Sequence, residues 1–220
     1  MKKVLLCFFA LTFVLQCTLS VSAEDYELSD WAREEITMPL EEFGIDNFKA
    51  PVTRKSFCEI VLKVLDAQGI TLECSEPYEE HPFSDTDDEN VVRLYNVKFI
   101  AYYSEKRVVQ GKGDNTFAPD DYITRKDAAW ILFRIYWYFN HEVSTYKKPA
   151  FGDFLDWEEM TGGSIDAIYI LASKGVEVMY GEGNGGYFYP NHYLTGEQAV
   201  VASERLARVA KKFVQEKAER

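Results

Sequence analysis

The chain has few of the residues that build metal and redox sites, with only four cysteines and three histidines among 220 residues. Beyond residue 23 only Cys58 and Cys74 remain, and two cysteines cannot complete a four-ligand zinc site. The histidines are too scattered along the sequence to supply the missing ligands: His81, His141 and His192. We therefore expect no metal site and no cofactor.

Basic residues are also scarce, because 24 lysines and arginines stand against 36 aspartates and glutamates, a formal net charge of −12. Such a surface repels nucleic acid and anionic lipid. After residue 23, no stretch approaches the roughly 18 to 20 apolar residues that a bilayer span requires. We expect neither a nucleic-acid partner nor membrane insertion of the mature chain.

The first 23 residues have the pattern of a secretory signal peptide. A basic start, Met1–Lys3, precedes an apolar run, Val4–Leu15, and a small-residue cleavage site, Val21–Ala23. Removing residues 1–23 leaves 22 basic against 36 acidic residues, a charge of −14. The sequence thus predicts a secreted product. In an oxidising compartment Cys58 and Cys74 could close a loop worth about 3 kcal/mol, but the sequence does not decide whether they are joined.

A repeated pattern dominates the rest of the chain. Thr53, Thr124 and Thr195 are each separated by 71 residues, and the residues at offsets 4, 7, 8, 11 and 12 after each threonine are apolar except for Ser203. This spacing is typical of one face of an amphipathic helix. Each threonine stands at an N-cap position, Asp127 and Gln198 stand where a capping box can close, and Gly69 is placed to end the first helix.

A second helical segment and a glycine-rich turn precede the later threonines. Residues 89–107 and 164–174 have helical composition, and 30–45 play that part in the first copy. The limits of the three units are 26–72, 83–143 and 151–211, followed by a charged C-terminal tail at 212–220. Because one unit is too small to bury a core alone, we predict a mainly α fold, with three helix-turn-helix repeats packed with pseudo-threefold symmetry.

The motifs of these units resemble the S-layer homology family. "FSD" at 83–85 followed by "GKGDNTFAPDDYITRKDA" at 111–128 matches its pattern, and "FGD" at 151–153 with "GGYFYPNHYLTGEQA" at 185–199 is a weaker copy. "LSDWA" at 28–32 and "APVTRKSF" at 50–57 form the most degenerate copy. On this alignment Asp30, Asp85 and Asp153 are equivalent.

The resemblance implies noncovalent anchoring to the bacterial envelope. Such triplets typically bind a secondary cell-wall polysaccharide carrying pyruvate ketals, in grooves between repeats, and localise their proteins to the cell wall or S-layer. The expected contacts are the helix-start residues and the adjoining turns: Thr53, Arg54, Gly111, Gly113, Thr124, Arg125, Gly181 and Thr195. Gly196 replaces the arginine in the third copy, which predicts a groove with a weaker hold on anions.

Physical chemistry supports the two arginines independently of the family. A cation at the first helical position opposes the positive end of the helix dipole, so helix propensity does not explain it. The free N–H groups at a helix start also suit an anion. The alternative, an arginine paired with a nearby acid of the same chain, remains equally open.

No catalytic constellation stands out in the sequence. "DTDDEN" at 85–90 lacks the glycine and the bidentate glutamate of a calcium loop, and the glycine turns lack the spacing of a P-loop. No nucleophile elbow or zinc-protease helix appears. We therefore predict a binding module and no enzyme. The competing hypothesis is an extracellular scaffold for envelope proteins that has lost its affinity for glycan.

Overall fold

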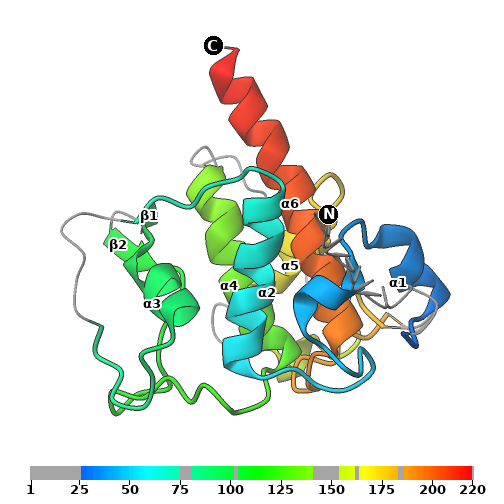
Figure 1. Ribbon diagram of the computed structural model, residues 1–220, viewed down its shortest axis with the longest axis horizontal. Coiled ribbons are helices and arrows are strands. Elements are labelled where there is room, and N and C mark those ends of the chain that lie inside the picture. Colours follow the sequence, from blue (N-terminus) through cyan, green and yellow to red (C-terminus); the bar gives the residue numbers. More distant parts are fainter. Residues whose placement is uncertain are drawn as a thin grey trace, which may run out of the picture.

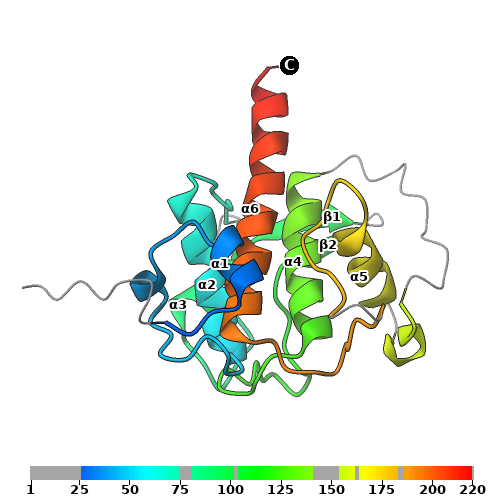
Figure 2. The ribbon, with the colours of Figure 1, turned by 90° about the vertical axis from the view of Figure 1, so that its right-hand side faces the viewer.

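The computed structural model describes residues 26–74, 81–101, 104–140, 154–161, 164–182 and 186–219. The predicted signal peptide at 1–23, His141 and Asp153 therefore lie outside the described residues. Three longer helices form the centre: α2 (Arg54–Ala67), α4 (Arg125–Phe139) and α6 (Gly196–Ala218). They lie side by side in both views (Figures 1 and 2). The prediction of a mainly α-helical fold is confirmed.

Shorter elements surround these helices. α1 (Asp30–Glu35) packs on α6, α3 (Glu89–Asn96) packs on α2, and α5 (Ser164–Ala172) packs on α4. The remaining elements are two 3-10 helices, η2 (Leu40–Phe43) and η4 (Trp157–Glu159), and a hairpin of β1 (Lys98–Ala101) and β2 (Ser104–Arg107). Among the described residues, no helix is both long and apolar enough to cross a membrane.

The apolar stripes predicted after each threonine form the core. Every residue at the five offsets is buried, including Phe57, Leu132 and Leu206, and all the apolar ones belong to one hydrophobic core. Ser203, the polar member, donates its hydroxyl to Ala199 O at 2.7 Å, so its burial leaves no unpaired donor. The pattern therefore identified the buried face of all three helices.

The three chain segments that enter these helices close a ring of backbone hydrogen bonds. Val52 N donates to Leu194 O at 3.0 Å, Leu194 N donates to Ile123 O at 2.9 Å, and Ile123 N donates to Val52 O at 3.0 Å. The residues are separated by the same 71 positions as the threonines, and each is at least 94% buried. This ring brings the starts of α2, α4 and α6 together.

Two helical segments predicted from composition are shorter in the structure. The helix expected over 89–107 ends at Asn96, whose side-chain amide donates to Val92 O at 3.0 Å. The following residues form the antiparallel hairpin, with Lys98 opposite Arg107. The segment 30–45 divides into α1 and η2, because Pro39 precedes Leu40 and cannot continue a helix hydrogen-bond ladder. Composition alone does not detect these breaks.

The predicted charged tail is not a separate segment. Residues 212–218 are the last turns of α6, which ends at Ala218 and projects beyond the other helices in both views (Figures 1 and 2). Phe213 near the start of this extension packs edge-on against Tyr136 at 5.8 Å between ring centroids. The extension is therefore anchored to α4 at its base.

Candidate functional site

Each predicted N-cap threonine caps its helix. The Oγ1 atoms of Thr53, Thr124 and Thr195 accept the amides of Ser56, Asp127 and Gln198 at 3.2, 3.3 and 3.4 Å. Gln198 completes the capping box by accepting Thr195 N at 3.2 Å. The Asp127 side chain instead faces Lys112 and Arg54. The threonines thus serve the fold, and their hydroxyls are already engaged.

The first two amides of each helix are engaged as well. Arg54 N, Arg125 N and Gly196 N donate to the carbonyls of Asp121, His192 and Ala50 at 2.8, 2.9 and 3.0 Å. The next amide in each helix donates to a carbonyl two residues earlier in the same turn. The expectation that these helix starts offer free N–H groups to an anion is therefore wrong, because the neighbouring turn has taken them.

Arg125 is buried, with 3% of its surface exposed. Its Nε donates to Phe188 O at 2.8 Å and its Nη2 to Tyr180 O at 2.7 Å, while Nη1 lies 3.3 Å from Glu182 Oε1. The guanidinium also lies 4.6 Å from the centroid of the Phe188 ring. Burial lowers the pKa of Arg125 from its ordinary value, and the nearby Glu182 carboxylate opposes that shift.

Arg54 repeats this arrangement at the start of α2. It is 4% exposed, and it donates to Phe117 O at 2.8 Å and to Gln110 O at 3.2 Å. Asp127 Oδ2 lies 3.7 Å from its Nη1 and also pairs with Lys112 Nζ at 3.0 Å. Both arginines therefore join neighbouring turns internally, which is the alternative that the sequence left open.

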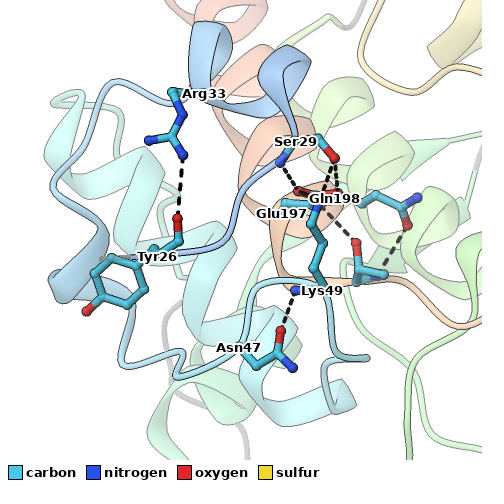
Figure 3. Close-up of polar contacts among 8 residues, drawn as sticks. Tyr26, Ser29, Arg33, Asn47, Lys49, Glu197 and Gln198 are labelled. Carbon is cyan, nitrogen blue, oxygen red and sulfur yellow. Dashed lines mark hydrogen bonds and ion pairs between the residues drawn. The ribbon is translucent and has the colours of Figure 1, made fainter. Parts of the chain in front are cut away.

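The presence of glycine rather than arginine at position 196 has a steric reason that the sequence did not reveal. A Cβ at this position would lie 3.1 Å from Phe48 Cα and 3.2 Å from Ile45 Cγ2, closer than ordinary packing. The next residue, Glu197, is 6% exposed and accepts Ser29 N at 3.0 Å and Lys49 Nζ at 3.0 Å. Figure 3 shows Ser29 and Lys49 converging on Glu197. The buried Glu197 carboxylate thus joins α6 to the segments before α1 and α2, where the other two helices use an arginine.

Two aspartates hold the turns before α4 and α6 with the same pair of hydrogen bonds. Asp85 accepts Phe117 N and Ala118 N at 2.8 Å each, and Asp156 accepts Phe188 N and Tyr189 N at 2.9 and 2.6 Å. The two aspartates are 71 residues apart. The alignment of Asp153 with Asp85 was therefore wrong by three residues. The stretches "FGD" at 151–153 and "FLD" at 154–156 both have the form Phe-x-Asp, and it is the second that matches "FSD" at 83–85.

The predicted glycines have two different roles. Gly111 and Gly181 allow close backbone approach, because a Cβ would lie 2.3 Å from Thr116 O and 2.6 Å from Tyr187 O. Gly113 has a φ of 107° at the exposed tip of its turn, a conformation that favours glycine. Of the three, Gly181 lines the groove described next.

A groove of about 410 Å³ lies where α1, α6 and the loop at 178–182 meet. Trp31 and Tyr180 line it with 43% and 42% of their surfaces exposed. Arg125 and Arg205 contribute cations to the same lining, and Glu182, Glu197 and Gln198 contribute acceptors. Exposed aromatic rings beside guanidinium groups suit a ring-shaped ligand that carries an acidic substituent.

Arg205 was missed in the sequence and organises one side of this groove. Its guanidinium lies 4.7 Å from the Tyr180 ring centroid, and Nη2 donates to Glu35 Oε1 at 2.8 Å. Arg134, 71 residues earlier, stacks on Trp130 at 4.9 Å and donates to Gln110 Oε1 at 2.7 Å. Extending the 71-residue comparison along the helices would have identified this pair of arginines.

The structure brings together part of the predicted site. Arg125 and Gly181 line the groove, whereas Thr53, Arg54 and Gly111 belong to the equivalent junction between α2 and α4. Thr124 and Thr195 lie under the junctions as helix caps. Within the described parts of the chain, no three His, Cys, Asp or Glu side chains are arranged to hold a metal ion.

The possible disulfide is not formed in the structure. Cys58 and Cys74 are both free thiols. Cys58 is fully buried in α2, and burial raises the pKa of its thiol to about 12. The Cys74 Sγ lies 3.6 Å from Arg93 O. Cys58 is therefore an unreactive core residue.

The Glu35 ion pairs make stability depend on pH. Hydrogen bonds from Arg205 and then Arg208 hold the pKa of Glu35 below its ordinary value of 4.5, against the opposing effect of burial. A lowered folded-state pKa stabilises the fold above pH 4.5, and this contribution is lost as pH falls through the folded-state value. We expect Glu35→Gln to reduce the acid sensitivity of the unfolding free energy, measured by urea denaturation at several pH values, by up to about 1 kcal/mol.

Glu34→Gln is the matched control, since Glu34 lies on the same helix and is exposed. Its acid sensitivity should equal that of the wild type. Equal acid sensitivity of the Glu35→Gln variant and the wild type would contradict the prediction.

Comparison with known proteins supports the identity of the middle unit. The S-layer homology domain model matches residues 84–129, which include Asp85, the glycine turn and the start of α4. An endoglucanase of Bacillus sp. (strain KSM-635) is 32% identical over 162 residues, which cover 72% of this chain and 15% of that protein. The chain thus aligns with a small part of this relative. Residues 84–129 are an S-layer homology domain.

Proposed function

We propose that the chain is a noncovalent anchoring module that binds an acidic, pyruvylated secondary polysaccharide of the bacterial cell wall. The observation that carries this proposal is the groove, which places Trp31 and Tyr180 beside the guanidinium groups of Arg125 and Arg205. S-layer homology domains generally anchor proteins to cell walls, and the match at 84–129 adds that support. The proposed location is the cell wall of the secreting bacterium.

The proposal includes three S-layer homology repeats, of which 84–129 is the best preserved. The closed ring of hydrogen bonds through Val52, Ile123 and Leu194 supports it, because the three residues are evenly spaced in the sequence. The packing of α3 on α2, α5 on α4 and α1 on α6 follows the same cyclic order. On this view the groove lies on the third repeat, between Arg125 of the second repeat and Trp31 of the first.

Cosedimentation with purified cell walls tests the function. The protein should pellet with intact walls and remain in the supernatant after the secondary polysaccharide has been removed. Trp31→Ala should weaken binding at least about tenfold, because truncating an aromatic anchor typically costs about 2 kcal/mol or more. Val214→Ala is the control, since Val214 is 47% exposed on α6 and does not line the groove. Arg125 is a poorer test residue because it also stabilises the fold.

The second candidate is a protein scaffold, and one observation favours it. Both motif arginines already bind carbonyls and acids of the same chain, so they have less capacity for a ligand. Equal pelleting with intact and stripped walls would favour this candidate and exclude the polysaccharide as ligand. A supernatant protein in both cases would exclude anchoring.

A further inference from the structure

A second surface, on the turn before α6, exposes large apolar and aromatic side chains that the fold does not require. The large apolar side chains exposed on or beside this turn include Leu155, Tyr187 and Tyr193, with 64%, 37% and 54% of their surfaces exposed. Tyr122 from the preceding turn is 52% exposed and lies 5.4 Å from Tyr193 between ring centroids. Together with Tyr189 and His192, these residues define the aromatic strip.

Three rings of the strip are stacked on one another. Tyr187 and Tyr189 stack with centroids 5.4 Å apart and an interplanar angle of 17°. Tyr189 and His192 stack at 4.6 Å and 7°. The backbone beneath them is held by Asp156, which accepts Tyr189 N at 2.6 Å, and by His192 N, which donates to Tyr189 O at 3.1 Å. A ligand would meet a preorganised surface and would pay little to order it.

The turn before α4 provides an internal comparison, because the same backbone contacts occur there. Ser84 N donates to Asn115 O as Leu155 N donates to Gly186 O, and Ala118 has a φ of 57° where Tyr189 has 55°. Yet at four of the positions where the two turns differ, a small or acidic side chain in the first turn is replaced by an apolar or aromatic one in the second. The pairs are Ser84 and Leu155, Thr116 and Tyr187, Ala118 and Tyr189, and Asp121 and His192.

This comparison separates folding from function. Since serine, threonine, alanine and aspartate satisfy the same turn, the fold does not require the aromatic and apolar residues at 155, 187, 189 and 192. Exposed apolar side chains that gather in one patch often mark a binding site. The strip therefore has the character of a binding surface.

The chemistry of the strip selects the kind of ligand. Tyrosine and histidine rings combine an apolar face with a polar edge, which matches the C–H faces and hydroxyl groups of a pyranose. The neighbouring charges are largely balanced: Lys55 Nζ pairs with Asp120 at 3.2 Å, Lys126 Nζ donates to Asn191 Oδ1 at 2.7 Å, and Glu159 accepts from Asn191 at 3.2 Å. An acidic polymer therefore gains little here.

We propose that the aromatic strip is a second glycan-binding site, which takes an uncharged pyranose chain. The strip and the groove share one hairpin, since Glu182 N on the groove side donates to Tyr187 O at 2.8 Å. The two sites can therefore act on adjacent segments of wall glycan, one uncharged and one acidic. The strip does not require the groove to bind, so this inference stands apart from the proposed anchoring function.

The test replaces the four strip residues by their counterparts from the turn before α4: Leu155→Ser, Tyr187→Thr, Tyr189→Ala and His192→Asp. The probes are cellohexaose and the β-1,4-linked hexamer of N-acetylglucosamine, with binding measured by titration calorimetry. The wild type should bind at least one hexamer, and the quadruple variant should bind it at least about tenfold more weakly. Because the same residues already occur on the same backbone, the variant should retain the wild-type circular dichroism spectrum.

Two controls make the outcomes decisive. Trp31→Ala should leave hexamer binding unchanged while it weakens wall binding, which separates failure of this inference from failure of the anchoring proposal. Sedimentation equilibrium should show the same oligomeric state for the wild type and the quadruple variant. Absence of hexamer binding by the wild type, equal binding by both proteins, or a wild-type dimer that the variant dissociates would each overturn the proposal.

Discussion

Arg125→Ala is expected to lower the free energy of unfolding by about 2 to 4 kcal/mol. The substitution leaves the carbonyls of Phe188 and Tyr180 without their buried donor, at a cost of about 1 to 3 kcal/mol each before relaxation. It also removes the guanidinium from the Phe188 ring. Urea denaturation at neutral pH measures the change.

Two further variants define what Arg125 contributes. Arg125→Lys should recover only part of the loss, because a lysine cannot donate along the two fixed directions of a guanidinium. Lys126→Ala is the neighbouring control, and it should cost less than about 1 kcal/mol, because the Lys126 bond to Asn191 is exposed. If Arg125→Ala lost wall binding with unchanged stability, the arginine would be a ligand contact and its structural role would be wrong.

Asp156→Ala is expected to cost about 3 kcal/mol or more. The carboxylate is 7% exposed and accepts two backbone amides, Phe188 N at 2.9 Å and Tyr189 N at 2.6 Å. Hydrogen bonds to charged groups contribute about 1.5 to 3 kcal/mol each. The pair also holds Tyr189 at a φ of 55°, a conformation that costs a tyrosine energy. Thermal and urea denaturation measure the loss.

Asp156→Asn should lose less than Asp156→Ala, because an amide oxygen can still accept one of the two N–H groups. Glu158→Ala is the control, since Glu158 is an exposed acid two residues away. A loss from Asp156→Ala within about 0.5 kcal/mol of the Glu158→Ala value would mean that water replaces the carboxylate. The turn before α6 would then not depend on this aspartate.

The candidate site was only partly accessible to sequence reasoning. Arg125 and Gly181 could be predicted because they belong to local motifs beside a capped helix. The repeat could also have marked Arg205, but not its place beside Trp31, because these two residues come from opposite ends of the chain and line one groove only through the packing of α1 on α6. No local pattern marks such a contact, since the energy that creates it is the burial of α1 against α6.

The sequence by itself determined the three helix starts, their threonine caps and the buried stripe of each helix, because hydrogen-bond capping and helical periodicity act over a few residues. The tertiary structure alone decided what the motif arginines do. Whether a guanidinium faces solvent or a carbonyl depends on a turn about 60 residues away: Arg54 meets Phe117 and Arg125 meets Phe188. At Gly196 a Cβ would lie 3.1 Å from Phe48 Cα, so a side chain there would require the neighbouring backbone to shift. Such distances are set by how the elements pack, which the local sequence does not encode.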